Sequence, residues 1–496
     1  MKGEKLKNSN KIPDFIKGYG KVKLYNENKV NEKSQDKVLK NIKESIIKSN
    51  LISGMTISFQ TNHRNNNNIL NLIIEEIDKL GIEDINLVVS SLGKIHEPLI
   101  KYIKKGVITK ISTSGIRGEI AKEISINSIL KNPVIFRSSG NKVDSVISGK
   151  LKIDVAFLIA SSCDTMGNSN GIEGKSAFGS IGYSMTDMKF ANKVIVITDN
   201  IVTFPLEKIS ISMDYVDYIV KIKSLTINTN FLNSIKLTKN PRELIIAEKA
   251  AEILIKLGYI KNGYSIQPGP GGAFLAISKY LKEYMKKNEI KGSFLSGGIS
   301  AYLVNLLEEG YFENIFDLQS YDVVSAKSLL NNEKHMEVSD SSYDRILSDL
   351  DIAIVNATEI DVDFNINLLT GSNGTIMGVP TVAQDIAHTS KITIAMSPSM
   401  RKRIPIITKK VTNTVIPGED VDILVTERGI CVNPKRKDLI KILKKENIKL
   451  TNIKKLYETV TKITGVPKKP TYTENIVGVI ESSDGKVIDI IKQIKK

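Results

Sequence analysis

Residues 154–174 read DVAFLIASSCDTMGNSNGIEG, and residues 351–371 read DIAIVNATEIDVDFNINLLTG. The two stretches align without a gap, and each runs from an apolar segment through an Asp and an Asn-x-Asn to a Gly. The shared positions are Asp154/Asp351, Ala156/Ala353, Ala160/Ala357, Asp164/Asp361, Asn168/Asn365, Asn170/Asn367 and Gly174/Gly371. An apolar run followed by turn residues is typical of a buried strand that ends in a loop. The repeat therefore predicts two copies of one structural unit.

The segments around the two copies predict the fold class. Later apolar runs stay nearly in register, with residues 193–197 matching 391–395 and residues 216–220 matching 421–425. Helical stripes alternate with short apolar runs, for example the stripe from Ile69 to Leu80 before the strand expected at residues 85–90. We therefore expect an α/β protein with two related domains and mostly parallel sheets, produced by an internal duplication.

Composition shifts along the chain suggest where the domains begin and end. Residues 1–35 are rich in Lys and Asn and predict a polar arm. The pattern weakens near residue 230, and Asn240-Pro241 then has the cap and first-turn residues of a new helix. We expect one domain over residues 36–230 and a second over 231–496. The second is expected to end in a hairpin, because two apolar runs flank Ser483-Asp484-Gly485.

Composition also limits the class of protein. The chain has 496 residues, of which 41% are hydrophobic and 25% charged, as in an ordinary globular protein. No apolar run is long enough to span a membrane and no signal core opens the chain, so we expect a cytoplasmic protein. The two cysteines, Cys163 and Cys431, fit a reducing compartment and provide neither a disulfide framework nor metal-ligand spacing. The net charge of +16 comes mainly from scattered Lys, without the arginine stripe of a nucleic-acid binder, and suits a phosphorylated or acidic carrier.

Polar residues after the repeated strands are candidates for a site. Open α/β sheets bind ligands at the carboxyl ends of their strands, so two copies predict a shared cleft. Ser162, Asp164 and Asn168 are candidate substrate-binding residues, with Asx turns that hold the loop as the alternative. Glu359 takes the place of Ser162 in the second copy and is the first candidate acid or base, with a loop salt bridge as the alternative.

Glycine loops are candidates for holding a thioester. Gly269, Gly271 and Gly272 lead into one expected helix, and Gly297 and Gly298 lead into another. Glycines let backbone N–H groups approach a ligand or an oxyanion closely, although a simple turn would need the same residues. Two further glycines, Gly371 at the end of the second copy and Gly374 just after it, are added as candidates for cofactor binding.

Arginine is scarce against lysine, so arginines near turns are candidate carboxylate clamps. Arg117 lies in Ser114-Gly-Ile-Arg-Gly118, Arg403 follows Arg401 in a basic turn, and Arg64 follows the first strand. An exposed, solvated side chain is the alternative for each of them.

Several runs taken together resemble the citrate lyase alpha chain, from about residue 40 to the C-terminus. They are Ser162–Lys175, Thr113–Gly118, Asn240–Leu244, Glu359–Asn367, Leu369–Gly374, Val421–Ile430 and Val432–Pro434. The resemblance implies two CoA-transferase-type domains and an enzyme that exchanges citrate for acetate on a thioester carrier. It implies a citrate lyase beta chain and a gamma chain, the acyl carrier protein, as partners in an oligomeric complex.

The resemblance also implies that the chain holds no cofactor of its own. Its thioester is phosphoribosyl-dephospho-CoA on the carrier chain, or acetyl-CoA, and the reaction passes through a mixed anhydride. The loop Ser296-Gly-Gly-Ile-Ser300 carries no carboxylate, in agreement with direct attack by the substrate.

Three loops depart from the family's pattern, at residues 60–64, 267–272 and 381–385, and mark a divergent member. Two alternatives therefore stay open. One is a CoA-transferase or thioester hydrolase for another carboxylate such as citramalate, and the other is a non-catalytic scaffold chain of the lyase complex.

Overall fold

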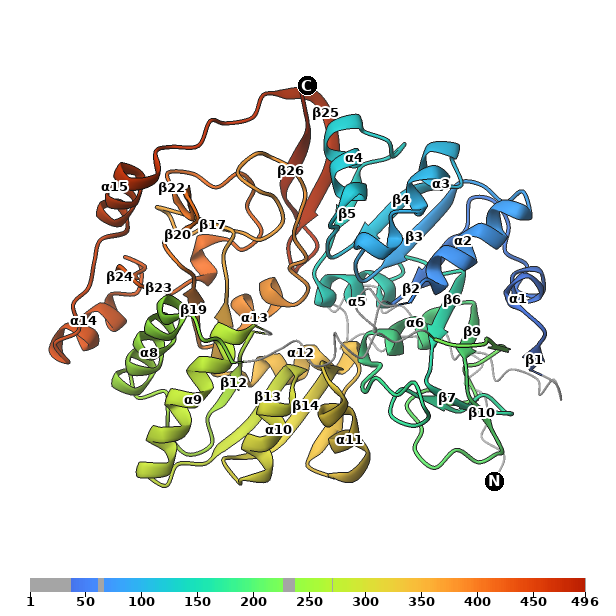
Figure 1. Cartoon of the computed structure of the whole chain (residues 1–496), viewed down its shortest axis with the longest axis horizontal. Coiled ribbons are helices and arrows are strands. Elements are labelled where there is room, and N and C mark those ends of the chain that lie inside the picture. The colour runs from blue at the N-terminus through green and yellow to red at the C-terminus, as the bar shows by residue number, and fades with distance from the viewer. Residues whose placement is uncertain (1–36, 61–66, 226–236, 270, 496) are drawn as a thin grey trace, which may run out of the picture.

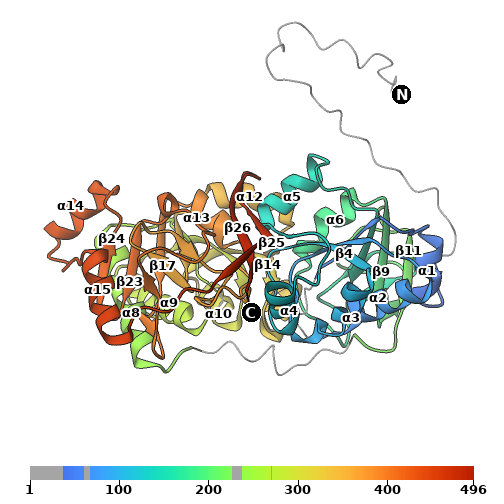
Figure 2. The same cartoon turned by 90° about the horizontal axis from the view of Figure 1, so that it is seen from above.

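Two large sheets lie side by side along the long axis of the computed structural model (Figures 1 and 2). The structure describes residues 37–60, 67–225, 237–269 and 271–495, so the expected polar arm and Arg64 lie outside the described residues. The first sheet has the strand order β1-β11-β9-β6-β2-β3-β4-β5-β25-β26, and the second has the order β15-β14-β13-β12-β16-β19-β23-β24.

The elements of the first half have the following bounds. The strands of the first sheet are β1 (Val38–Leu39), β2 (Thr56–Phe59), β3 (Ile85–Val89), β4 (Ile108–Thr113), β5 (Val134–Phe136), β6 (Val155–Ile159), β9 (Lys193–Thr198), β11 (Tyr218–Lys221), β25 (Tyr472–Glu481) and β26 (Val487–Ile494). The helices are α1 (Ile42–Lys48), α2 (Ile69–Lys79), α3 (Leu99–Lys105), α4 (Glu119–Asn127), α5 (Ser139–Ile147) and α6 (Met185–Phe190). A small sheet holds β7 (Ser162–Asp164), β8 (Ser169–Asn170) and β10 (Ile201–Val202).

The elements of the second half follow the same plan. The strands of the second sheet are β12 (Ser265–Gln267), β13 (Gly292–Ile299), β14 (Phe312–Ser320), β15 (His335–Glu337), β16 (Ile352–Val355), β19 (Ile392–Met396), β23 (Ile423–Thr426) and β24 (Gly429–Val432). The helices are α8 (Pro241–Lys256), α9 (Gly272–Lys287), α10 (Ala301–Glu308), α11 (Val323–Asn331), α12 (Asp340–Ser348), α13 (Ala383–Thr389), α14 (Lys437–Lys445) and α15 (Ile453–Thr464). The remaining strands of this half are short and are β17 (Glu359–Asp361), β18 (Ile366–Asn367), β20 (Met400–Arg401), β21 (Ile404–Pro405) and β22 (Ile407–Thr408).

The strand order confirms the internal duplication. The order β11-β9-β6-β2-β3-β4-β5 in the first sheet repeats as β23-β19-β16-β12-β13-β14-β15 in the second, with parallel neighbours throughout both runs. The repeated aspartates do the same work in both halves. Asp154 accepts a hydrogen bond from the N–H of Thr56 at 2.9 Å, and Asp351 accepts one from the N–H of Ser265 at 2.9 Å. Each aspartate thus joins its own strand to the start of the neighbouring strand.

Burial explains why the repeated strands are so apolar. Every residue of β6 and of β16 is buried, as expected for central strands of a parallel sheet. One apolar core runs through the first half and into the adjoining face of the second, where it includes Leu318, Ile360 and Ile386. A second core fills the space between the second sheet and helices such as α8 and α9. The two halves are therefore packed against each other through apolar side chains.

The C-terminal hairpin corrects the expected domain boundary. β25 and β26 form the expected antiparallel hairpin, but β25 pairs in parallel with β5, with Gly478 opposite Val134 and Ile480 opposite Phe136. The hairpin therefore extends the first sheet, and the second domain does not run to residue 496 (Figure 1). Local sequence predicts that two strands pair with each other. It does not say which distant strand edge they will cover.

Candidate active site

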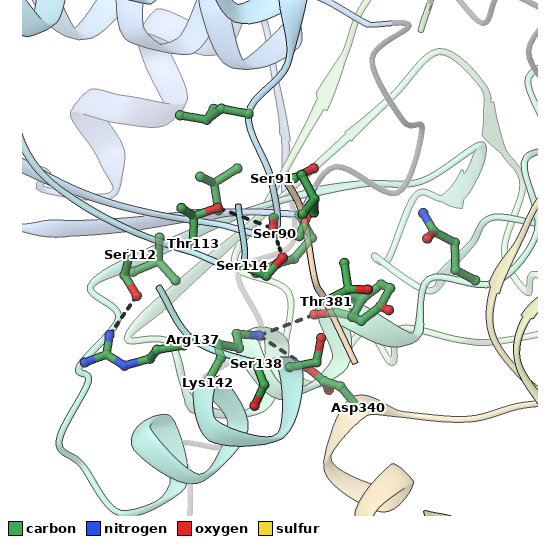
Figure 3. Close-up of a pocket in the computed structure, with 18 of the residues that line it drawn as sticks. Ser90, Ser91, Ser112, Thr113, Ser114, Arg137, Ser138, Lys142, Asp340 and Thr381 are labelled. Atoms are coloured by element: carbon green, nitrogen blue, oxygen red, sulfur yellow. Dashed lines mark hydrogen bonds and ion pairs between the residues drawn. The ribbon is translucent and has the colours of Figure 1, made fainter. Parts of the chain in front are cut away.

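A cleft between the two halves contains two adjoining pockets. The first, which we call the hydroxyl pocket, has a volume of about 260 Å³ and lies at the carboxyl ends of β3, β4 and β5. Its wall is rich in hydroxyl groups, from Ser90, Ser91, Ser112, Thr113, Ser114, Ser138 and Ser139 (Figure 3). Ser90 and Ser91 directly follow β3, and Ser112 and Thr113 end β4, which Ser114 follows. Ser138 and Ser139 are the cap and the first residue of α5, just after β5. The parallel sheet brings them to one edge, where open α/β sheets bind ligands.

Lys142 supplies a buried positive charge to the hydroxyl pocket. It lies on α5, and its Nζ is 2.5 Å from Asp187 Oδ1 and 3.2 Å from Asp340 Oδ2. Burial disfavours the charged amine, but the two carboxylates outweigh that effect and raise the pKa of Lys142 above its usual value. Lys142 is therefore a cation at neutral pH. Because Asp340 belongs to α12, the pair also joins the two halves.

Arg137 is held at the wall of the same pocket. Its Nη1 donates to Ser112 Oγ at 2.7 Å, and its Nε donates to Glu481 Oε2 at 2.7 Å. Figure 3 shows the guanidinium beside Ser112, on the side away from Lys142. Arg137 thus holds the hydroxyl of Ser112 in place in the wall of the pocket.

The second pocket, which we call the glycine-loop pocket, has a volume of about 500 Å³ and lies at the carboxyl ends of β12, β13 and β16. Gly269, Gly271 and Gly298 line it, together with the apolar side chains of Phe274, Ile354, Val355, Leu368 and Met377. Gln267 starts the loop, and its Oε1 accepts hydrogen bonds from Tyr343 Oη at 2.6 Å and Ser296 Oγ at 3.2 Å.

Two glycines of β13 are required by the geometry of this pocket. Gly297 has a φ of +101°, which side chains rarely adopt, and a Cβ there would lie 2.6 Å from Gln267 Nε2. At Gly298 a Cβ would lie 2.1 Å from the ring of Tyr321, another lining residue. A side chain at either position would displace groups that shape the pocket.

The two pockets share part of their lining. Residues common to both are Arg117, Tyr183, Gln319, Val379 and Thr381. The segment at residues 378–381 belongs to the second half and contacts the turn of the first half that carries Arg117. A Cβ on Gly115 would lie only 2.2 Å from the carbonyl oxygen of Gly378, so this close approach needs glycine. The two pockets therefore adjoin each other along these shared residues.

The structure brings some of the expected site residues into this cleft. Arg117 lines both pockets, and Gly269, Gly271 and Gly298 line the glycine-loop pocket. Arg401 also lines it, whereas Arg403 is exposed on the β20–β21 turn and lines neither pocket. Gly272 is the first residue of α9, just beyond the pocket lining.

Glu359 is buried away from both pockets, with its carboxylate committed to hydrogen bonds. Oε2 accepts from Asn367 Nδ2 at 2.9 Å and from the N–H of Thr412 at 2.7 Å, while Oε1 accepts from Thr412 Oγ1 at 3.0 Å. The candidate acid or base thus joins β17 to β18 and to the segment at residue 412. The hydroxyl of Ser162 likewise accepts from Asn200 Nδ2 at 3.1 Å within its own half.

Asp164 and Asn168 of the first repeat form an Asx turn, which was the alternative to a role in substrate binding. Asp164 Oδ1 accepts from the N–H groups of Met166, Gly167 and Asn168 at 2.9 to 3.0 Å. Asn168 Nδ2 donates to Asp164 Oδ2 at 2.8 Å. These side chains stabilise their own loop and do not line the cleft.

Gly371 and Gly374 form a turn that packs against Tyr472 at the start of β25, outside both pockets. The N–H of Gly374 donates to the carbonyl of Gly371 at 2.8 Å, and a Cβ on Gly374 would lie 2.8 Å from Tyr472 Oη. The φ of +81° at Gly374 and its contact with Tyr472 explain the glycine at that position.

Sequence reasoning missed the hydroxyl pocket itself. The pairs Ser90-Ser91 and Thr113-Ser114 follow apolar strands directly and were the available signal. Lys142 and Asp340 had no such signal, because they come together only when α5 packs on α12. Among the described residues no group of three or more His, Cys, Asp or Glu side chains is arranged to hold a metal ion. No helix in the described ranges is long and apolar enough to cross a membrane.

These features define a class of protein: a duplicated α/β protein whose two halves enclose a hydroxyl-lined pocket with a buried lysine next to a glycine-lined pocket. Solved structures with this fold include the malonate decarboxylase alpha subunit of Acinetobacter baumannii, at a TM-score of 0.66 and 15% identity, covering 87% of this chain and 90% of that one. At that identity the likeness shows the fold alone.

Closer relatives identify the family. A model of the citrate lyase alpha subunit family matches residues 35–494. The citrate lyase alpha chain of Haemophilus influenzae is 43% identical over 466 residues, 92% of this chain and 93% of the relative. The crystal structure of the putative alpha subunit of citrate lyase from Streptococcus mutans, in complex with citrate, matches with a TM-score of 0.92 and 41% identity, covering 94% of this chain and 93% of that one. The chain belongs to the citrate lyase alpha subunit family.

This result confirms the expected family, the CoA-transferase-like fold and the expectation of an enzyme. The citrate lyase alpha chain of Klebsiella pneumoniae, 41% identical over 471 residues, agrees, covering 94% of this chain and 92% of the relative. None of these relatives supports the alternatives of another carboxylate substrate or of a non-catalytic scaffold.

Proposed function

We propose that the chain exchanges citrate for acetate on a thioester, with citrate in the hydroxyl pocket and the thioester in the glycine-loop pocket. The observation that supports this proposal is the shared lining of the two pockets, because a carboxylate bound in one would lie beside a thioester carbonyl bound in the other. Holding the two reacting groups in contact converts a bimolecular reaction into an effectively unimolecular one.

The chemistry of the hydroxyl pocket supports citrate as its ligand. Citrate carries three carboxylates and one hydroxyl, and the pocket offers the guanidinium of Arg117 and a wall of hydroxyl donors, with Lys142 held beside them by Asp187 and Asp340. Hydrogen bonds from cations to carboxylates are about twice as strong as neutral ones, and serine hydroxyls rotate to suit the acceptor. The Streptococcus mutans relative, described in complex with citrate, adds support from a chain of similar fold and sequence.

The glycine-loop pocket suits the arm of a CoA-type thioester. Its apolar residues can cover the methylene groups of that arm, and Gly269, Gly271 and Gly298 let backbone approach the thioester closely. The chain would not need a bound cofactor of its own, because the thioester arrives on acetyl-CoA or on the phosphoribosyl-dephospho-CoA of a carrier.

The exchange would take place in two balanced steps. A citrate carboxylate oxygen attacks the acetyl carbonyl, the C–S bond breaks, and a thiolate leaves a mixed anhydride of acetate and citrate. The thiolate then attacks the citryl carbonyl, the C–O bond of the anhydride breaks, and acetate leaves. Arg117 lines both pockets and can neutralise the oxyanion that develops in each step.

The proposal extends to partners and location. The relatives are named alpha chains, and such a name implies that the enzyme has further chains. We propose that this chain joins a citrate lyase beta chain and an acyl carrier gamma chain in one cytoplasmic, oligomeric complex. The net charge of +16 supports an anionic carrier, because opposite charges raise the rate of encounter.

The test uses the purified full chain with acetyl-CoA as carrier surrogate. Citrate should yield citryl-CoA and acetate in equal amounts, measured by mass spectrometry, and citramalate should compete poorly as acceptor. A preference for citramalate would overturn the choice of substrate. Failure to form citryl-CoA from acetyl-CoA, together with failure to form the citryl thioester of the acetylated carrier chain, would overturn the activity.

A further inference from the structure

We propose that Glu481, on the C-terminal hairpin, is a positioning residue of the hydroxyl pocket. It would act through Arg137 and Asn141, which hold the wall and the helix that present the pocket's polar groups. This inference rests on the proposed function of that pocket as the carboxylate site. It makes the last strand pair of the chain part of a site built mainly from residues 60–142.

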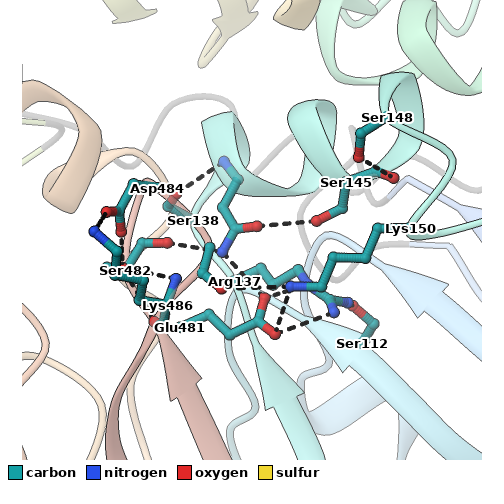
Figure 4. A network of polar contacts seen from close by, with 12 residues as sticks. Ser112, Arg137, Ser138, Ser145, Ser148, Lys150, Glu481, Ser482, Asp484 and Lys486 are labelled. Carbon is teal, nitrogen blue, oxygen red and sulfur yellow. Dashed lines mark hydrogen bonds and ion pairs between the residues drawn. The ribbon is translucent and has the colours of Figure 1, made fainter. Parts of the chain in front are cut away.

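The first connection runs through Arg137 to the end of β4 (Figure 4). Glu481 Oε2 accepts from Arg137 Nε at 2.7 Å and Oε1 accepts from Nη2 at 3.4 Å, a two-pronged contact across 344 positions of sequence. The remaining terminal nitrogen, Nη1, donates to Ser112 Oγ at 2.7 Å. Ser112 is one of the hydroxyl residues that line the pocket. Glu481 therefore fixes the orientation of a planar guanidinium that in turn fixes Ser112.

The second connection runs to the helix that carries Lys142. Asn141 Nδ2 donates to Glu481 Oε2 at 3.2 Å and to the carbonyl of Ser482 at 2.8 Å. Asn141 is the neighbour of Lys142 in the first turn of α5. Three pocket-lining residues, Ser138, Ser139 and Lys142, belong to this turn or to its cap. The hairpin thus holds the helix end from which the cation of the pocket projects.

The contact between Glu481 and Arg137 is buried and charged. Each of the two side chains is 7% exposed, and a cavity of about 10 Å³ beside them has room for roughly one water. Burial acts to raise the pKa of Glu481, but the hydrogen bonds and the charge of Arg137 outweigh it and hold the pKa below its usual value. Glu481 is therefore ionised at neutral pH, and Arg137 has little space for another orientation.

Attachment of the hairpin to the first sheet does not require this buried charge. The backbone of β25 pairs with β5 from Gly478 to Ile480, and a Cβ on Gly478 would lie 2.9 Å from the ring of Phe136. On the same hairpin Glu474 pairs with Lys492 at 2.8 Å, with 94% of the Glu474 side chain exposed. A buried ion pair adds little net stability over apolar packing, so orientation of Arg137 is the better account of Glu481.

The test compares Glu481→Gln with the matched control Glu474→Gln in the full chain. The glutamine side chain of the first variant would keep the size and one acceptor but lose the charge that orients the guanidinium. We expect the KM for citrate and its Kd by calorimetry to rise about tenfold, with the KM for acetyl-CoA unchanged. The control should leave all three within about twofold of the wild-type values, because exposed ion pairs contribute little.

Each outcome decides the inference. An unchanged KM for citrate would overturn it, and so would a fall in kcat with both KM values unchanged, which is the pattern of a purely structural loss of active protein. If Glu481→Gln does not fold, Arg137→Lys carries the test, because it keeps the charge and loses the two-pronged contact. The same selective rise in the citrate KM is then expected, and its absence would overturn the inference. Failure of the wild-type chain to bind citrate would instead overturn the proposed function.

Discussion

Replacement of Glu359 by Gln separates a structural carboxylate from a catalytic one. The sequence makes Glu359 the first candidate acid or base, whereas the structure buries it 3% exposed and away from both pockets. Its carboxylate accepts three hydrogen bonds, from Asn367 Nδ2 and from the N–H and hydroxyl of Thr412. Glu359→Gln keeps the shape of the side chain and removes its charge. We expect the variant to lose stability and to keep its turnover.

The size of the effect follows from those three contacts. Hydrogen bonds to a charged group contribute about 1.5–3 kcal/mol each and neutral ones about 1 kcal/mol. Gln can replace part of the network, because the Thr412 hydroxyl can also accept, so we expect a net loss of about 1–3 kcal/mol. At roughly 2–4 °C per kcal/mol for domains of this size, Tm should fall by about 2–12 °C.

Differential scanning fluorimetry and steady-state rates of citryl-CoA formation measure the two quantities. Glu313→Gln serves as the control, since Glu313 pairs with Lys291 at 3.8 Å and 57% of its side chain is exposed. The control should change neither Tm nor rate measurably. A loss of turnover beyond about tenfold in Glu359→Gln at unchanged Tm would refute the structural reasoning and restore Glu359 as a residue of the chemistry.

Three further predictions concern other parts of the chain. Arg117→Gln should raise the citrate KM at least tenfold, whereas Arg403→Gln on the exposed turn should not, and equal effects in citrate titrations would contradict the placement of the site. Burial lowers the pKa of His96 to about 4 from an unfolded value of 6.5, so the unfolded state takes up this proton first as pH falls. The contribution of His96, about 3 kcal/mol, should be lost between pH 6.5 and 4, and urea unfolding of His96→Gln should lack that part of the slope. Burial raises the pKa of Cys163 and Cys431 to about 12, so thiol reagents at pH 8 should label neither before denaturation, and rapid labelling of the native protein would argue against their burial.

Local features were predictable because they depend on neighbours in sequence. Asn240 caps α8 as expected, with its side chain accepting from the N–H of Arg242 at 3.0 Å. The Asx turn at Asp164 needs only the four residues that follow it. An apolar run such as residues 155–159 predicts a buried strand, because removing apolar side chains from water is favourable whatever the rest of the fold.

The duplication was also visible in sequence, because the two copies share a structural requirement. Asp154 and Asp351 each join a central strand to its neighbour through a hydrogen bond, so both copies keep an aspartate at this position. These strands and the repeat were enough to predict an α/β architecture in two related halves. The family followed from motifs spread over most of the chain.

Only the tertiary structure decided which residues form the site. Ser90, Ser112 and Lys142 lie in separate segments and meet because parallel strands bring their carboxyl ends to one edge and α5 packs beside it. The repeated loops looked more like a site, but their polar groups are hydrogen-bonded within the loops or to other segments of the same half, as Asp164 is to Leu206 and Glu359 is to Thr412. The partner of Arg137 lies 344 residues away, at Glu481. Such a contact depends on which sheet edge the last strands cover, and that choice is set by packing of the whole chain and not by any local pattern.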